Sequence, residues 1–249
     1  MMTIFERIHP RQPLKNLKWF DILIVTGILF GWFIYTSTQT WLSQSNAREQ
    51  VLRASASEDV WLYANNLKLQ ILFLVLALLY LLLRHYDFKQ LQLRLSWLLL
   101  WAPLIFAMVG LASDLVATLA GSYNYFDPRI LQQIDWTFVE VARKLLLLPP
   151  LTMVYALFNG FYEEFFFLGL LTSVNPKYKW FVLAYSTLIR FTFHTYQGFL
   201  SAFTIGVVFG LIYYFLYTYK IKNLWPFFLA HAIADFFGSS LIYLLVVWR

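Results

Sequence analysis

Two adjacent carboxylates, Glu163 and Glu164, stand inside the apolar run GFYEEFFFLG. A charged side chain in such surroundings costs free energy unless it is paired, and residues of this kind usually mark function. His194 and His231 are the two histidines that fall in apolar segments, and Asp235 follows His231 by four residues on the same helical face. Carboxylates and imidazoles brought together from several helices can activate water and stabilise an oxyanion. The pattern therefore makes these residues candidate catalytic groups.

The alternative for any one of these polar residues is a structural hydrogen bond between helices, worth ~1–2 kcal/mol in model peptides. A lone histidine would fit that explanation, but the combination of a carboxylate pair, a histidine and a histidine–aspartate pair favours chemistry. Asp235 is placed to hold the His231 imidazole by a hydrogen bond and so fix its tautomer. Glu163 and Glu164 are about 100° apart around a helix, so we expect one to face the reaction centre and the other to orient a partner.

The sequence predicts no cofactor, although a zinc site stays open. The chain has no HExxH helix and no GxSxG turn, which argues against the usual zinc-protease and serine-hydrolase arrangements. It also has no cysteine, which excludes thiolate metal ligands and a cysteine nucleophile. Two carboxylates and two histidines are nevertheless a ligand set that zinc accepts.

The elements that carry these residues are expected to be membrane helices. Of the 249 residues, 60% are hydrophobic and 13% are charged, whereas soluble domains are nearer half apolar and about a quarter charged. A span needs about 20 apolar residues. About seven stretches qualify: roughly 19–36, 67–83, 96–120, 151–172, 180–198, 199–219 and 224–247. We therefore expect one integral membrane domain over 1–249, an all-α polytopic bundle of about seven transmembrane helices plus interfacial helices.

Basic residues gather in alternate loops and predict the orientation of the bundle. Eleven of the 19 Lys and Arg residues lie on one expected side: Arg7, Arg11, Lys15, Lys18, Arg84, Lys89, Arg94, Lys177, Lys179, Lys220 and Lys222. The positive-inside rule then places the N-terminus and these loops in the cytoplasm of a multi-pass protein of the cell membrane. The opposite loops carry basic residues that weigh against this orientation: Arg48, Arg53, Lys68 and Arg129. Because loops explain the net charge of +6, we do not expect nucleic acid as a partner.

The segments between the spans also have recognisable patterns. Residues 37–66 are polar with scattered apolar positions and predict an extracytoplasmic helical hairpin or cap. Residues 84–95 alternate basic and apolar groups, like a helix at the cytoplasmic interface. Residues 121–134 carry the turn signals of an outer loop.

The segment 135–148 leads into the glutamate helix. Glu140, Arg143 and Lys144 share one helical face, so this helix can lie flat at the interface. Pro149-Pro150 then breaks it, because proline lacks an amide proton and clashes with the preceding turn. The helix of the two glutamates should therefore begin afresh, as broken helices do around protein-lined cavities in membranes.

Three motifs, EEFFFLG, RFTFHTYQG and HAIAD, follow one another on consecutive helical regions. They resemble the CPBP family of intramembrane proteases, the CAAX protease and bacteriocin-processing family that is also called Abi. The family pattern is EExxxR, then FxxxH, then HxxxN or HxxxD. The resemblance covers about residues 150–240, which is the expected catalytic core.

The resemblance implies a glutamate-dependent endopeptidase with its site inside the membrane. In the eukaryotic CAAX-processing members this site opens toward the cytoplasm. Carried over position by position, Glu163 and His194 would activate the water, and Glu164 would support the site. His231 with Asp235 would stabilise the oxyanion or orient the substrate carbonyl.

Two positions depart from the family pattern. The arginine of EExxxR is Leu168 here, so the ion pair that would steady the glutamate helix is missing, and the phenylalanine of FxxxH is Arg190. We hypothesise that the guanidinium has moved from one helix to the next, where Arg190 pairs with Glu164 or Glu163. The alternative is that Arg190 extends to the membrane surface and the chain is a non-catalytic regulator.

The leading interpretation is an intramembrane endopeptidase that cleaves a peptide, a lipidated peptide or a membrane protein. For bacterial members the resemblance implies bacteriocin immunity or processing, or the maturation of a secreted signalling peptide. The second hypothesis is a non-catalytic membrane regulator or scaffold that binds a sensor kinase or a peptide. A transporter that uses the buried carboxylates as proton sites is disfavoured, because no inverted repeat is visible.

Overall fold

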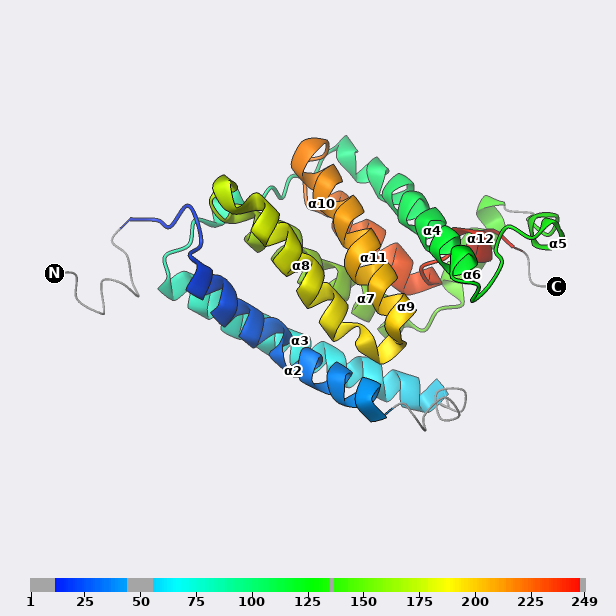
Figure 1. Cartoon of the computed structure of the whole chain (residues 1–249), viewed down its shortest axis with the longest axis horizontal. Coiled ribbons are helices and arrows are strands. Elements are labelled where there is room, and N and C mark those ends of the chain that lie inside the picture. Colours follow the sequence, from blue (N-terminus) through cyan, green and yellow to red (C-terminus); the bar gives the residue numbers. More distant parts are fainter. Residues whose placement is uncertain (1–11, 44–55, 135–136, 247–249) are drawn as a thin grey trace.

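A computed structural model describes residues 12–43, 56–134 and 137–246 (Figure 1). These residues are mostly helical and form no β-strand; their only sheet-like pairs are isolated bridges between Leu14 and Tyr86 and between Ile134 and Val246. The prediction of an all-α bundle is therefore confirmed.

The longer helices are α2 (Trp19–Ser43), α3 (Ala56–Leu83), α4 (Trp101–Leu119), α7 (Pro150–Glu164), α8 (Lys179–Phe193), α10 (Gly210–Tyr219) and α11 (Trp225–Phe237). Short helices complete the chain: α5 (Pro128–Leu131), α6 (Phe138–Leu146), α9 (Phe199–Phe203) and α12 (Leu241–Leu245). Two of the helices contain π-helical segments. α7 continues into the π-helix η5 (Phe165–Leu170), and α9 runs through the π-helix η9 (Thr204–Phe209) into α10.

The structure contains fewer helices that are long and apolar enough to cross a membrane than the sequence predicts. Within the described residues, four helical stretches qualify: Trp19–Ser43, Trp61–Leu83, Trp97–Leu119 and Phe199–Tyr219. A fifth is added if Phe138–Leu146 and Pro150–Ser173, which meet at 103°, form one broken span. The number seven is thus not confirmed, because α8 has 15 residues, α11 has 13, and Gly238 at φ 81° interrupts the last expected span. At about 1.5 Å per residue, both helices fall short of the ~30 Å hydrocarbon core.

One end of the bundle collects the basic loops. Helices α2, α8 and α11 begin there and α3 and α10 finish there, toward the upper left of Figure 1. The Leu224 amide donates to the Gln92 carbonyl at 2.9 Å, and the Tyr214 hydroxyl donates to the Lys179 carbonyl at 3.2 Å. The described basic residues of these loops are Lys15, Lys18, Lys89, Arg94, Lys177, Lys179, Lys220 and Lys222, while Arg7 and Arg11 lie outside the described residues. We call this the basic end.

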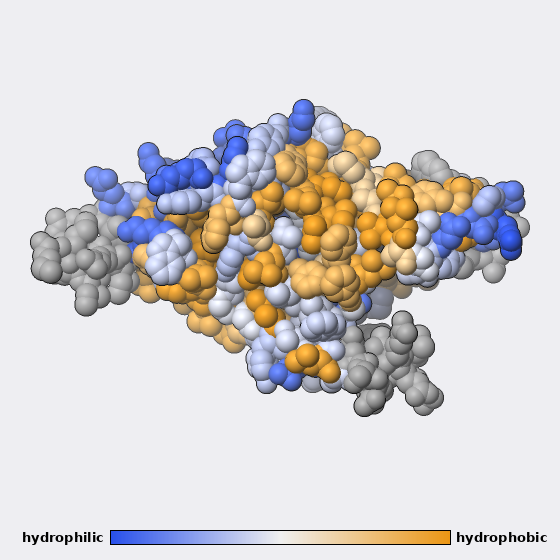
Figure 2. Space-filling view, viewed as in Figure 1, coloured by the Kyte–Doolittle hydropathy of each residue, from blue (hydrophilic) through white to orange (hydrophobic). Residues whose placement is uncertain are grey.

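The opposite end is held together by hydroxyl groups and helix caps. Ser37 of α2 is hydrogen-bonded to Thr195, just after α8, at 2.9 Å. Asp114 of α4 accepts a hydrogen bond from the Ile242 amide at 2.9 Å and so secures the first turn of α12. Figure 2 shows polar residues along the two ends and a broad hydrophobic surface between them, as a membrane-embedded bundle requires.

The expected interfacial helix over 84–95 is wrong. This segment is a turn followed by one short 3₁₀ helix, η3 (Phe88–Gln90), which the Asp87 side chain caps. Arg84 is 1% exposed, and its Nε donates to Asp21 of α2 at 2.6 Å. Because Arg84 is neutralised inside the bundle, it does not belong among the charges that set the orientation.

The other connecting segments follow the predictions more closely. Residues 37–43 and 56–66 continue α2 and α3, and 44–55 lie outside the described residues. Residues 121–134 form a loop that contains α5. On α6, Arg143 pairs with Glu140 at 2.8 Å, and the bend between α6 and α7 falls at the predicted proline pair.

Small residues let the helices of the core approach one another closely. A Cβ atom on Gly160 of α7 would lie 2.5 Å from the Phe228 carbonyl oxygen and 3.3 Å from the His231 Cβ on α11. A Cβ atom on Gly206 would lie 2.6 Å from the Phe191 Cα, so η9 and α8 are equally close. Contacts of this kind are typical of helix packing in membranes. Gly160 thereby sets the distance at which the next turn of α7 faces α11.

Replacing Gly160 by alanine is expected to destabilise the fold by about 1–3 kcal/mol, the usual range for overpacking. The added methyl group would meet backbone atoms, which cannot move aside as a flexible side chain would. Gly27→Ala is the matched control, since nothing lies within 4 Å of its Cβ position. Thermal unfolding of the purified protein in detergent measures both changes. Equal midpoints for the two variants would contradict the close approach of α7 and α11.

Candidate active site

The carboxylate pair lies in the last turn of α7, where the helix changes its hydrogen-bonding pattern. Pro150 is the first residue of α7, a position that needs no amide proton. Glu164 is the last residue before η5. Single π-turns are frequent at functional sites, because the inserted residue re-aims the neighbouring side chains. Residues 162–171 are all buried, so both carboxylates face protein rather than lipid.

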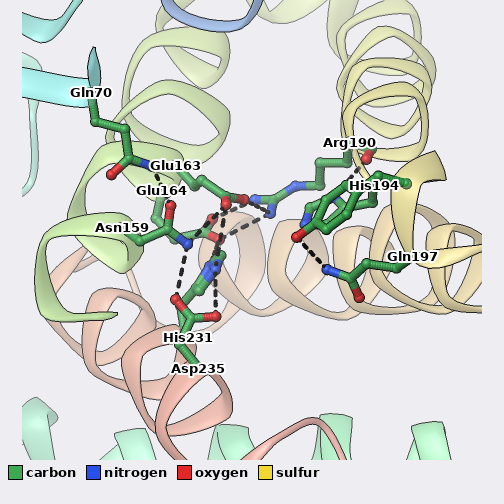
Figure 3. Close-up of polar contacts among 10 residues, drawn as sticks. Gln70, Asn159, Glu163, Glu164, Arg190, His194, Gln197, His231 and Asp235 are labelled. Atoms are coloured by element: carbon green, nitrogen blue, oxygen red, sulfur yellow. Dashed lines mark hydrogen bonds and ion pairs between the residues drawn. The ribbon is translucent and has the colours of Figure 1, made fainter. Parts of the chain in front are cut away.

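Glu164 forms a two-pronged ion pair with Arg190 of α8 (Figure 3). The Nη1 and Nη2 atoms of Arg190 donate to Oε1 at 3.0 Å and to Oε2 at 2.5 Å. The guanidinium also stacks on Phe167, with Cζ 3.9 Å from the ring centroid. The Arg190 side chain is 2% exposed, so the alternative that it extends to the membrane surface is wrong. The ion pair between Arg190 and a glutamate, as hypothesised from the sequence, is present.

The second partner of Glu164 is His231 on α11. The His231 Nδ1 lies 2.8 Å from Oε1 of Glu164, and because a carboxylate accepts, Nδ1 carries the hydrogen. The His231 Nε2 lies 3.7 Å from Oε1 of Glu163 and 3.8 Å from Oδ1 of Asp235. Both distances exceed a hydrogen bond. The expectation that Asp235 fixes the imidazole is therefore wrong: Glu164 does so, since it faces the ring from the adjacent helix.

Asp235 is held instead by Asn159, one helical turn before Glu163. The Asn159 Nδ2 donates to Oδ2 of Asp235 at 2.9 Å and to Oε1 of Glu163 at 3.1 Å, so it bridges the two carboxylates. The Asn159 Oδ1 accepts from Nε2 of Gln70 on α3 at 2.6 Å. The motifs do not point to either amide. The signal for them is their isolation, since Gln70 stands alone in an apolar span and Asn159 shares the face of Glu163.

Glu163 keeps one carboxylate oxygen without a donor. Its Oε2 has no hydrogen-bond partner among the described residues, and the nearest cationic atom, Nη1 of Arg190, is 3.9 Å away. The Glu163 side chain is only 4% exposed. Buried carboxylate oxygens are normally satisfied by protein, water or a ligand. Oε2 therefore marks the place where a reacting molecule can bind.

His194 closes α8 and points into the same site (Figure 3). Its Nδ1 lies 2.8 Å from the Arg190 carbonyl oxygen. A carbonyl can only accept, so Nδ1 carries the hydrogen and Nε2 of the neutral ring keeps its lone pair. Within the described residues Nε2 forms no hydrogen bond. The ring is thus presented in the state that can accept a proton from water.

Leu168, at the family's arginine position, is part of the apolar core. It is 2% exposed and packs in a cluster with Phe209 and Tyr213. Arg190 supplies the guanidinium from the facing helix, and the absence of a side chain at Gly210 leaves room for its stem, since a Cβ there would lie 3.4 Å from Cδ of Arg190.

The candidate ligands do not surround a metal position. Within the part of the chain that the structure describes, no group of three or more His, Asp or Glu side chains is arranged to hold a metal ion. Independence of metal stays a prediction for experiment.

Residues 145–237 match the family model described as type II CAAX prenyl endopeptidase Rce1-like. The match begins at the end of α6 and finishes with α11, close to the predicted core of 150–240. It contains the residues of the site that lie on α7, α8 and α11: Asn159, Glu163, Glu164, Arg190, His194, His231 and Asp235. No curated protein and no solved structure matches the chain significantly. The resemblance that the three motifs indicate is confirmed over residues 145–237, which are similar to the Rce1-like family of CAAX proteases.

Proposed function

We propose that the chain is an intramembrane glutamate-type endopeptidase with Glu163 as its general base. The match to the CAAX protease family model supports a protease that acts within the bilayer on a peptide or a membrane protein. One observation carries the finer proposal. The unpartnered Oε2 of Glu163 and the free Nε2 of His194 are acceptors without donors, presented by neighbouring helices.

In the proposed mechanism, one water molecule donates to both acceptors and attacks the substrate. The water oxygen bonds to the carbonyl carbon while its proton passes to Glu163, and His194 orients the second hydrogen through Nε2. The carbon–nitrogen bond then breaks, and Glu163 returns the proton to the departing amine. The first step needs Glu163 ionised, which the Arg190 guanidinium 3.9 Å away favours, and the second step needs it protonated, the state in which the first step leaves it.

Glu164 acts as a positioning residue rather than as the base. Both of its oxygens already accept hydrogen bonds from Arg190 or His231, whereas Oε2 of Glu163 accepts none. The hydrogen bond to His231 leaves Nε2 of that ring facing Glu163 and Asp235. From there, a proton on Nε2 would stabilise the oxyanion or orient the carbonyl.

The proposed biological role follows from the resemblance to the CAAX protease family. The substrate is a peptide, a lipidated peptide or a membrane protein, and bacteriocin immunity or processing and signal-peptide maturation are the roles that the resemblance offers. A non-catalytic regulator remains the competing function, and the first prediction below separates the two.

Glu163→Gln is expected to lower the cleavage rate by about 10²–10⁴-fold, the usual worth of a general base. Because the amide keeps the volume and an oxygen for Asn159, thermal stability should stay near that of the parent. Glu164→Gln should instead destabilise the fold, since it leaves Arg190 with a neutral partner. The rates are measured with the purified protein in liposomes on a mixture of quenched fluorescent peptides. An unchanged cleavage rate in Glu163→Gln would refute Glu163 as the base, whereas no cleavage by the parent protein would favour the regulator.

Arg190→Leu is expected to abolish activity and lower stability, because removing one member of a buried pair costs about 3–5 kcal/mol. Leu168→Arg combined with Arg190→Phe restores the family pattern and should recover part of both. The control is Arg143→Leu, which removes an arginine whose ion pair is exposed and should change stability by less than about 1 kcal/mol. Folded-protein yield and thermal unfolding measure the series. Normal yield and activity in Arg190→Leu would refute the relocated ion pair.

Exhaustive chelation is expected to leave peptide cleavage unchanged, because Glu163 needs no Lewis acid to take a proton from water. The same peptide mixture measures the rate before and after treatment. Loss of activity, with recovery on adding zinc, would reassign the carboxylates and histidines as metal ligands.

A further inference from the structure

The polar network is closed on the side of the basic end. Beyond Glu164 in that direction the chain continues through η5, where the side chains from Phe165 to Leu170 are at most 2% exposed. Tyr213 of α10, also 2% exposed, lies 6.0 Å from the Arg190 guanidinium and closes the same side. A substrate that approached from the basic end would have to displace this aromatic layer.

The network is open toward the opposite end. Its most exposed members are Asp235, whose side chain is 27% exposed, and the residues Tyr196 and Gln197 that follow His194. All three lie where α8 and α11 finish, away from the basic loops in which these helices begin. Figure 3 shows Gln197 beside His194 on this side of the site.

A cavity of about 370 Å³ lies at this end of the bundle, and Gln197 is one of its lining residues. Its wall includes Gln197, three residues after His194, and Phe237, two residues after Asp235. Residues of α4, α9 and the turn before α12 form other parts of the wall. Most of its polar groups are hydroxyls: Ser113, Ser122, Tyr125, Ser201, Thr204, Ser239, Ser240 and Tyr243. None of the lining residues is charged. Hydroxyls both donate and accept, so this wall suits the amides of an uncharged peptide segment better than a free carboxylate.

We propose that the active site opens through this cavity at the end of the bundle opposite the basic loops, and that its substrate is an uncharged peptide segment presented from the extracytoplasmic side. The proposal rests on the proposed function and on the orientation that the basic loops predict. It sets this chain apart from the eukaryotic CAAX-processing members, whose sites open toward the cytoplasm.

Single-cysteine variants test the opening without any assay of activity, because the chain contains no cysteine. Ser122→Cys at the cavity should react with a membrane-impermeant sulfonated maleimide in intact cells. Lys177→Cys and Lys222→Cys, exposed at the basic end, should react only after the cells are permeabilised. The reverse pattern would overturn the proposal.

A second pair of variants tests the depth of the opening. Thr204→Cys, on the cavity wall, should react with a small cationic methanethiosulfonate added outside intact cells. Leu168→Cys, equally buried but on the closed side, should react from neither side. Protection of Thr204→Cys together with reaction of Leu168→Cys from the cytoplasmic side would refute the route.

Sealed membrane vesicles test from which side of the membrane a peptide is cleaved. A soluble, uncharged quenched fluorescent peptide added outside should be cleaved by right-side-out vesicles and not by inverted ones, and the cleavage should be lost in Glu163→Gln. Cleavage only by inverted vesicles would overturn the proposal. Absence of cleavage in both would count against the peptidase, while the labelling results would still decide the direction of the opening.

Discussion

The carboxylate of Glu164 is the point at which three segments of the chain meet. It accepts two hydrogen bonds from Arg190 on α8 and one from His231 on α11, while it is itself part of α7. A buried charge is tolerated only when its partners are close and well oriented. The helices must therefore approach to the distances that these bonds require. The glycines at the helix crossings make such an approach sterically feasible, and the ion pair makes it favourable.

The two neighbouring glutamates are thereby given different chemistry by their surroundings alone. Glu164 accepts three hydrogen bonds from Arg190 and His231, so its charge stabilises the contact between the helices. Glu163 receives a single amide hydrogen bond from Asn159, which Gln70 orients in turn from α3. α3 lies outside the segment that matches the family, yet it sets the position of an amide in the site. The scaffold of the site thus extends beyond the segment that matches the family model.

The sequence predicts which buried polar residues gather in the bundle. Apolar surroundings make Glu163, Glu164, Arg190 and the two histidines stand out, because each buried polar group demands a partner. What it does not predict is which partner each one takes. His231 binds Glu164 rather than Asp235 because of how α7 is rotated against α11. The spacing of residues within one helix does not reveal that rotation.

The number and length of the spans were predicted less well for a related reason. Hydropathy registers apolar stretches such as 180–198 and 224–247, but the helices end where His194 and Gly238 turn the chain. The sequence also does not predict the buried ion pair between Asp21 and Arg84. An acidic residue in the first turn of one span and a basic residue after the end of another span resemble ordinary boundary residues. Positive charges near helix ends report orientation only when they are not neutralised within the protein.

The shortness of α8 has a consequence for the surrounding lipid. With 15 residues, α8 is about 22 Å long, and its outer face presents Trp180, Phe181 and Leu188. The acyl chains beside it must compress, or water must descend to meet the end of the helix, at a cost that grows with every ångström of mismatch. His194 stands at that end. The thickness of the surrounding bilayer therefore sets how far below the headgroups the imidazole lies, and changes in lipid composition would alter the hydration of the site while every contact within the protein stayed the same.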